Sequence, residues 1–292
     1  KTLDGMESDI AKGAYAVGGF RDLVSILGAS KAVRGDRLLI GMGEFGKITR
    51  IRPDLLGNPF TFAHVGEPTA PGQMGLDEMR ALGDRFMVTG IVGNPLSKSR
   101  SPAMHAAAFK NAGMRGIYLK FETDSLDGMA ECVRGYGIRG LNVTIPHKTA
   151  VIGHLESLDA GAEAAGAVNT VVNDSGILVG YNTDVYGIET AFARAGREMS
   201  GGMLVMGYGG SARAAVAAGL ENGCDVTIVG RDDFKSKALA DELGVSHAPN
   251  GVCMSEFNMV VNCTPIGMYG DGNYPADVSG LTFRHSVLDL VY

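Results

Sequence analysis

The chain has 292 residues, of which 45% are hydrophobic and 20% charged, and its formal net charge is -6 at pH 7. This length accommodates two domains, and the acidic balance, with an isoelectric point of about 5.5, argues against a nucleic-acid partner. No apolar run approaches the roughly 18 residues that a membrane span needs, and no signal peptide is visible. We therefore expect a globular protein with no membrane partner.

The four cysteines are scattered along the chain, without CxxC pairing or nearby histidine clusters. This spacing favours buried free thiols in a reducing, cytoplasmic environment over disulfides or a metal site. We expect no metal. The residues concerned are Cys132, Cys224, Cys253 and Cys263.

Both ends of the sequence are unusual. It starts at Lys1 and stops within "SVLDLVY", an apolar run typical of a buried strand. Natural domains rarely stop inside such a strand, so we expect a fragment at both ends.

Residues 1–86 alternate between strand and helix patterns. The runs "SDIAKGAYAV", "DRLLIGMG" and "FTFAHVG" predict strands, and "FRDLVSILGASKAV" and "GLDEMRALGDRF" predict helices. Such alternation indicates a parallel sheet covered by helices. Because a closed (β/α)₈ barrel needs about 250 residues, we interpret this portion as the last part of a barrel.

A second α/β domain is predicted over residues 87–187. Strands are expected in "RFMVTGIVG", "GIYLKFET" and "IRGLNVTIP", with helices from about Pro102, over "LDGMAECVRGYG" and from "KTAVIGHL". The segment "AVNTVVNDSGILVGYNTD" predicts a hairpin that turns at residues 173–176.

A third domain is predicted over residues 188–292, where "GGMLVMGYGGSARAAVAAGL" gives a strand, a Gly-rich turn and a helix. Gly207, Gly209 and Gly210 would let the backbone approach a dinucleotide pyrophosphate at the helix N-terminus. Ala212 stands where a third glycine is usual. The alternative is a tight structural turn.

The next strand, "DVTIVGR", bears on which dinucleotide binds. An NAD site would place an acid at its end, but Arg231 stands there, and an arginine suits the 2′-phosphate of NADP. The alternative is that Arg231 is a solvated loop cation.

Polar residues upstream form a candidate substrate site. In "NPLSKSRSP", Ser99 and Ser101 could face a carboxylate, although Ser101 could also simply cap the following helix.

The strand "LNVTIPHK" places Asn142 and Thr144 on one face and is followed by Lys148. A desolvated lysine beside a carboxylate, here Asp184, can donate or accept a proton during carbonyl reduction. Asn169 adds an amide suited to a hydroxyl ligand. Taken one by one, these charges could also be solvated surface groups.

Residues 88–292 resemble the shikimate dehydrogenases. The motifs "GNPLSKSRSPAMHAAAF", "LNVTIPHK", "GAVNTVV", "GYNTDVYG", "GYGGSARA", "VNCTPIGM" and "LDLVY" follow the order and spacing of that family. The resemblance implies a substrate-binding α/β domain followed by an NADP-binding Rossmann domain. It implies that Ser99 and Ser101 bind the substrate carboxylate and that Lys148, paired with Asp184, is the acid/base. The other residues that it implies contact substrate are Asn142, Thr144, Asn169, Asp184 and Tyr292. The residues that it implies hold NADP are Gly207, Gly209, Gly210, Ser211, Ala212, Arg231 and Thr264.

Residues 1–86 resemble the last third of a type I 3-dehydroquinate dehydratase, through "SDIAKGAYAV", "IGMGEFGKITRI" and "FTFAHVGEPTAPGQM". That family is a (β/α)₈ barrel with a Schiff-base lysine, a role that requires a neutral amine in a dry pocket. By position the lysine is Lys12, Arg50 would bind the substrate carboxylate, and Thr69 and Gln73 would hold 3-dehydroquinate. Thr69 stands where the family often has serine, and the family's general-base histidine is missing from the sequence.

Together the resemblances imply a bifunctional enzyme of chorismate and aromatic amino acid biosynthesis. It would reduce 3-dehydroshikimate to shikimate with NADPH, and dehydratase activity is expected only in the full-length protein. One alternative is an NAD-dependent quinate/shikimate dehydrogenase, which Arg231 disfavours. Another is a non-catalytic ligand sensor, which the presence of both Lys148 and Asp184 disfavours. The sequence leaves the oligomeric state open.

Overall fold

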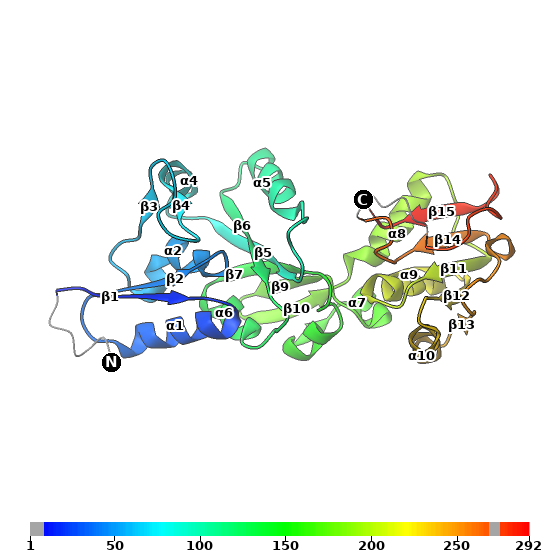
Figure 1. Cartoon of the computed structure of the whole chain (residues 1–292), viewed down its shortest axis with the longest axis horizontal. Helices are drawn as coiled ribbons and strands as arrows, with labels where there is room; N and C mark the ends of the chain where they lie inside the picture. Colours follow the sequence, from blue (N-terminus) through cyan, green and yellow to red (C-terminus); the bar gives the residue numbers. More distant parts are fainter. Residues whose placement is uncertain (1–8, 269–274, 292) are drawn as a thin grey trace. The chain divides into compact units, whose positions relative to one another are not determined.

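The computed structural model describes residues 9–268 and 275–291 (Figure 1). The chain forms two compact units. The first unit contains the chain up to Ser157 and the segment Thr170–Gly180, and the second contains Leu158–Asn169 and the chain from Tyr181 onward. Among the described residues, no helix is long and apolar enough to cross a membrane.

The first unit begins with the predicted strand–helix alternation. β1 and β2 pair in parallel, with Ala11 opposite Arg37 and Ala16 opposite Met42. The helix between them buries Phe20, Leu23 and Ile26, which share one face because they are spaced three residues apart. The strand expected over "FTFAHVG" is confirmed for two residues only. The elements are β1 (Ala11–Ala16), α1 (Phe20–Ala32), β2 (Arg37–Met42), η2 (Phe45–Lys47), α2 (Ile48–Ile51), α3 (Pro53–Leu56), β3 (Ala63–His64), β4 (Met74–Gly75) and α4 (Leu76–Leu82).

A six-stranded mixed sheet follows, in the order β6-β5-β7-β9-β10-β8. β5 pairs in parallel with β6 and β7, and β7 pairs antiparallel with β9. The predicted hairpin turns where Ser175 and Gly176 take φ of 55° and 98°, as a tight hairpin turn requires. The elements are β5 (Met87–Gly93), α5 (Ser101–Asn111), β6 (Gly116–Glu122), α6 (Met129–Gly135), β7 (Ile138–Val143), η3 (Ala150–His154), β8 (Ser157–Leu158), β9 (Thr170–Asp174) and β10 (Ile177–Tyr181).

The N-terminal segment and this sheet share one core. α1 packs against α6, and the rings of Phe20, Phe45 and Phe121 lie 5.0 to 5.4 Å apart, centroid to centroid. The phenol of Tyr136, a fully buried residue, donates a hydrogen bond to the Leu23 carbonyl oxygen at 2.9 Å. The segment therefore packs on the face of the sheet that carries Phe121.

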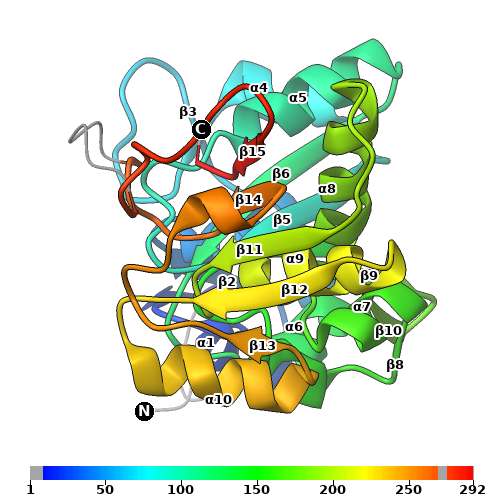
Figure 2. The same ribbon diagram turned by 90° about the vertical axis from the view of Figure 1, so that its right-hand side faces the viewer.

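The second unit contains a five-stranded parallel sheet in the order β13-β12-β11-β14-β15 (Figure 2). Its core is rich in alanine from α9, which lets that helix lie close to the sheet. The elements are α7 (Ala160–Ala165), α8 (Thr183–Arg194), β11 (Gly202–Met206), α9 (Gly210–Glu221), β12 (Asp225–Val229), α10 (Asp233–Leu243), β13 (Ser246–His247), η4 (Met254–Glu256), β14 (Met259–Asn262) and β15 (Ser286–Asp289).

The cysteine prediction is partly wrong. No disulfide joins any of the four cysteines, all of which lie among the described residues, and Cys132 and Cys224 are buried. In contrast, Cys253 is exposed and Cys263 is half-buried. Cys253 lies in the loop before η4, a position that periodicity cannot assign to the core.

Candidate active site

Asn142 and Thr144 lie at the carboxyl end of β7, as their alternation predicts. Both side chains are half-buried, whereas Leu141 and Val143 point to the other face and are buried. The Asn142 amide nitrogen donates to the Thr170 hydroxyl at 3.3 Å. The polar stripe is therefore continued onto the neighbouring strand β9.

Lys148 follows in the turn after β7 and is half-buried. The residue before it, His147, is only 3% exposed and bonds through Nε2 to the Thr123 carbonyl oxygen at 2.7 Å. The backbone N–H of His147 also donates to the Thr144 carbonyl at 2.9 Å. Sequence reasoning assigned no role to His147, but its hydrogen bonds anchor the turn that carries Lys148.

The serine loop after β5 is held by side chains of β6. Glu122 accepts from the Leu96 backbone N–H, and the Lys120 amine donates to the Leu96 carbonyl, both at 3.0 Å. Ser99 and Ser101 are half-buried. Ser101 is the first residue of α5 and not its cap, because Arg100 takes that position without a side-chain hydrogen bond. The simple capping role considered for Ser101 is therefore wrong.

Tyr118 on β6 contacts the candidate site, and sequence reasoning missed it. Its phenol donates to Asn142 Oδ1 at 2.7 Å. Burial raises the pKa of Tyr118, so the phenol remains a donor near neutral pH. The alternation of Tyr118, Lys120 and Glu122 along one face of β6 was the available signal.

Asn169 and Asp184 lie together in the second unit. The Asn169 amide nitrogen donates to Asp184 Oδ1 at 2.7 Å, and Asn169 Oδ1 accepts from the Thr183 N–H at 3.0 Å. Asp184 lies in the first turn of α8, where the helix dipole stabilises its charge. The structure thus joins two residues that the sequence predicted as hydroxyl ligands.

The Gly-rich turn after β11 fits a dinucleotide pyrophosphate. Gly207 has φ of 120°, and a Cβ there would lie 3.2 Å from the Cys263 carbonyl oxygen, whereas the space beside Gly209 is open. α9 begins at Gly210 without a side-chain cap, which leaves its first N–H groups available to an anion. Ser211 is half-buried, and Ala212 is fully buried at the position where a small residue allows close helix packing.

Arg231 and Thr264 follow β12 and β14, the two neighbours of β11. Arg231 is exposed, and Thr264 donates through both its N–H and its hydroxyl to Asn262 Oδ1, at 2.9 and 2.7 Å. All three loops therefore meet at the carboxyl edge of the sheet, where open α/β sheets bind their ligands.

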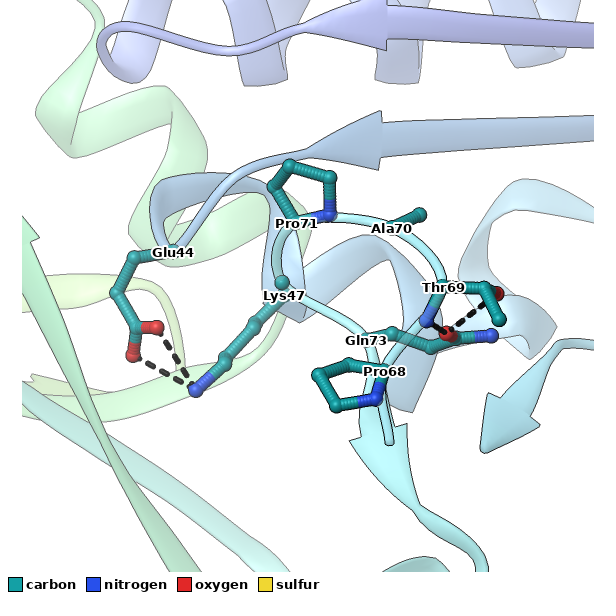
Figure 3. Close-up of a pocket in the computed structure, with 8 residues that line it drawn as sticks. Glu44, Lys47, Pro68, Thr69, Ala70, Pro71 and Gln73 are labelled. Carbon is teal, nitrogen blue, oxygen red and sulfur yellow. Dashed lines mark hydrogen bonds and ion pairs between the residues drawn. The ribbon is translucent and has the colours of Figure 1, made fainter. Parts of the chain in front are cut away.

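The residues predicted for the dehydratase are only partly assembled. Thr69 and Gln73 line an open hollow of about 410 Å³ with Glu44 and Lys47, and Gln73 Oε1 accepts from the Thr69 N–H at 2.8 Å (Figure 3). Lys12 is exposed on β1, with its amine 4.6 Å from the centroid of the Phe62 ring.

Arg50 is buried in α2, where burial lowers its pKa, and its Nε has no hydrogen-bond partner among the described residues. Tyr292, predicted to touch substrate, lies outside the described residues. Within residues 9–268 and 275–291, no cluster of histidine, cysteine and carboxylate side chains could hold a metal ion.

Comparison with known proteins identifies both parts of the chain. A family model of the shikimate dehydrogenase substrate binding domain matches residues 91–171. The shikimate dehydrogenase (NADP(+)) of Symbiobacterium thermophilum is 37% identical over 223 residues, which is 70% of this chain and 76% of that protein. The chain belongs to the shikimate dehydrogenase family.

Solved shikimate dehydrogenase structures agree with this assignment. Shikimate 5-dehydrogenase from Thermus thermophilus, in complex with NADP(H) and shikimate, aligns with a TM-score of 0.64 at 33% identity, covering 71% of this chain and 79% of that one. Quinate dehydrogenase from Corynebacterium glutamicum, in complex with NAD, aligns with a TM-score of 0.66 at 30% identity, covering 72% and 81%. In this dehydrogenase chain, residues 1–84 match the type I 3-dehydroquinase family.

Proposed function

We propose that the chain reduces 3-dehydroshikimate to shikimate with NADPH, and catalyses the reverse reaction with NADP. The observation that carries the proposal is the placement of Asn142, Thr144 and Lys148 at one strand end, inside the segment that matches the family's substrate-binding domain. A polyhydroxylated ring acid needs amide and hydroxyl partners for its hydroxyl groups and a proton donor at its ketone.

Reduction of the ketone adds a hydride to carbon and a proton to oxygen. Bound NADPH would supply the hydride. The Lys148 ammonium would give its proton to the oxygen as negative charge develops there, and in the reverse direction the neutral amine would take that proton from the alcohol. Asp184 would orient this lysine and a substrate hydroxyl.

Recognition of the rest of the substrate would come from two groups of residues. Ser99 and Ser101, on the loop that β6 holds, would bind the carboxylate. Asn142, Thr144 and Asn169 would bind ring hydroxyls. The hydrogen bond from the Asn169 amide nitrogen to Asp184 Oδ1 supports this assignment, because it fixes the orientation of both groups and so determines which of their polar atoms can bind a substrate hydroxyl.

NADP would bind along the carboxyl edge of the second unit's sheet. The N-terminus of α9 and the glycines of the preceding turn would hold the pyrophosphate, and Thr264 would contact the cofactor from the loop after β14. Arg231 would pair with the 2′-phosphate, which NAD lacks.

One observation favours a second candidate, an NAD-linked quinate/shikimate dehydrogenase. Asp232 follows Arg231 directly and caps α10 by accepting from the Lys235 N–H at 3.1 Å. A carboxylate at this position could also accept hydrogen bonds from an unphosphorylated ribose. The ratio of NADP to NAD turnover separates the two candidates.

The N-terminal segment would not catalyse dehydration in this chain. A Schiff-base lysine needs a desolvated amine, whereas Lys12 is exposed to solvent. The chain should therefore not dehydrate 3-dehydroquinate. The ultraviolet absorbance of the conjugated dehydration product measures this.

The proposal is tested by incubating the chain with 3-dehydroshikimate and NADPH, and identifying the product chromatographically. Parallel reactions replace NADPH with NADH, or 3-dehydroshikimate with 3-dehydroquinate. Shikimate as the main product, formed faster with NADPH, supports the proposal. Faster turnover with NADH and 3-dehydroquinate would favour the quinate enzyme, and no reduction of either ketone would contradict both.

A further inference from the structure

Tyr118 connects two parts of the substrate site that are far apart in sequence. It stands on the edge strand β6, whereas Asn142 stands on β7, and β5 lies between them. The phenol reaches across β5 to donate to Asn142 Oδ1 at 2.7 Å. One side chain therefore contacts both the predicted hydroxyl-binding strand, through Asn142, and the predicted carboxylate loop, through Leu96.

Packing alone does not explain a tyrosine at this position. The ring packs with Ile91 and Leu96, and His105 stacks on it at a centroid distance of 4.0 Å and an interplanar angle of 22°. A phenylalanine would make all of these contacts. A buried phenol, in contrast, needs a hydrogen-bond partner, and the partner here is an amide of the candidate site.

The hydrogen bond determines how the Asn142 amide is presented. An asparagine amide has an oxygen that accepts and a nitrogen that donates, and it can flip between two orientations. Because the Tyr118 phenol donates to the oxygen, the nitrogen is directed to the Thr170 hydroxyl, 3.3 Å away. The nitrogen carries two hydrogens, and Thr170 takes one of them.

We propose that Tyr118 is a positioning residue that holds the Asn142 amide with its nitrogen available to donate to a substrate hydroxyl. This inference rests on the proposed function, since it concerns how the site recognises a ring hydroxyl of shikimate. The flipped amide would present an acceptor and leave the phenol facing an NH₂ group. Tyr118 thus selects one of two hydrogen-bonding patterns before the substrate arrives, which reduces the ordering required on binding.

The test compares the Tyr118→Phe variant with the wild-type chain by calorimetric titration with shikimate. Phenylalanine keeps the ring and its stacking on His105 and removes only the hydroxyl group. We expect the dissociation constant for shikimate to rise about 5- to 20-fold, the effect of losing one buried hydrogen bond. The dissociation constant for NADP should remain within about twofold, and kcat should change much less than KM.

A matched control is Tyr136→Phe, which removes the hydroxyl of a second buried tyrosine in the same unit. The Tyr136 phenol donates to the backbone carbonyl of Leu23, and within the described part of the chain it has no hydrogen bond to a candidate site residue. This variant should lose thermal stability and keep wild-type affinity for shikimate. A loss of affinity in Tyr136→Phe equal to that in Tyr118→Phe would show a general effect of instability and overturn the proposal.

A double-mutant cycle tests whether Tyr118 acts through Asn142. In an Asn142→Ala background, Tyr118→Phe should lower shikimate affinity by less than about twofold, because the amide that it positions is absent. An equal loss in both backgrounds, or no loss in the wild-type background, would overturn the inference while leaving the proposed function intact. A wild-type chain that binds no shikimate would overturn both.

Discussion

The six-stranded sheet of the first unit and the five-stranded sheet of the second use their strands in different ways. The first sheet carries polar site residues on the strands themselves, with Tyr118 on β6, Asn142 on β7 and Thr170 on β9. In the second sheet the central strands β11 and β14 are almost wholly buried and apolar, and the residues proposed to bind NADP lie in the loops that follow the strands.

The difference matches the chemistry of the two proposed ligands. A small hydroxylated ring is recognised by individual donors and acceptors, which side chains on a rigid strand can hold in place. A pyrophosphate is bound by backbone N–H groups at a helix N-terminus, for which the side chains must be small or absent. Single side-chain changes should therefore act on substrate binding in the first unit. In the second unit, backbone geometry should dominate cofactor binding.

Among the variants that compare substrate binding with cofactor binding, the largest effect is expected from Asn142→Ala, which removes a substrate-binding side chain from the first sheet. Loss of its amide leaves both a substrate hydroxyl and the Tyr118 phenol without a partner, so KM for shikimate should rise roughly 10- to 100-fold. Steady-state kinetics with varied shikimate measures this change. The dissociation constant for NADP serves as the control, and a parallel loss of NADP affinity would break the separation between the two sheets.

The next effect tests the backbone role of the glycines in the second unit. Gly207 has φ of 120° and little space for a Cβ, so Gly207→Ala should lower the free energy of unfolding by about 1–3 kcal/mol. Gly209 has φ of -96° and open space beside it, so Gly209→Ala should change the free energy of unfolding by less than about 0.5 kcal/mol. Urea denaturation of both variants is the measurement. Equal losses would contradict the difference in strain.

Arg231→Ala tests the comparison from the cofactor side, because Arg231 is a position where a side chain, and not the backbone, should contribute to cofactor binding. Loss of its charge should raise the dissociation constant for NADP about tenfold and leave that for NAD within about twofold. Lys237→Ala is a matched control, since Lys237 is an exposed cation on α10 that pairs with Asp241 at 3.0 Å. If both variants lost NADP affinity equally, Arg231 would contribute only general positive charge.

The smallest effect concerns the apolar face of the first sheet. Tyr136→Phe removes the hydrogen bond to Leu23, which links the N-terminal segment to the sheet, and should lower the free energy of unfolding by about 1 kcal/mol. Thermal unfolding followed by circular dichroism measures the loss. A change in KM for shikimate in this variant would show that the two faces of the sheet are coupled.

The pattern of neighbouring residues in the sequence was sufficient to predict most elements of the fold. The Gly-rich turn before α9 and the hairpin at Ser175 and Gly176 were predicted because their turn chemistry is encoded by adjacent residues. The helix expected from "KTAVIGHL" forms only a short 3₁₀ helix, Ala150–His154, and the strand near Ala63 is two residues long. In both places tertiary packing outweighs a weak local preference.

The site was predicted less completely, because its supporting contacts join residues that are distant in sequence. Tyr118 and Asn142 are 24 positions apart, as are His147 and Thr123, and each pair meets only because the strand order places β6 and β7 on either side of β5. Periodicity identifies the face on which a residue lies, but not the partner that it meets across the sheet.

The most direct test of the central claim is the rate of shikimate-dependent NADP reduction in Lys148→Ala, measured beside wild type and Lys110→Ala. Lys110 is an exposed lysine in the last turn of α5 and controls for the loss of a positive charge. We expect kcat to fall about 10²- to 10⁴-fold in Lys148→Ala and to stay at the wild-type value in Lys110→Ala. A fall of less than about tenfold in Lys148→Ala would contradict the assignment of Lys148 as the proton donor.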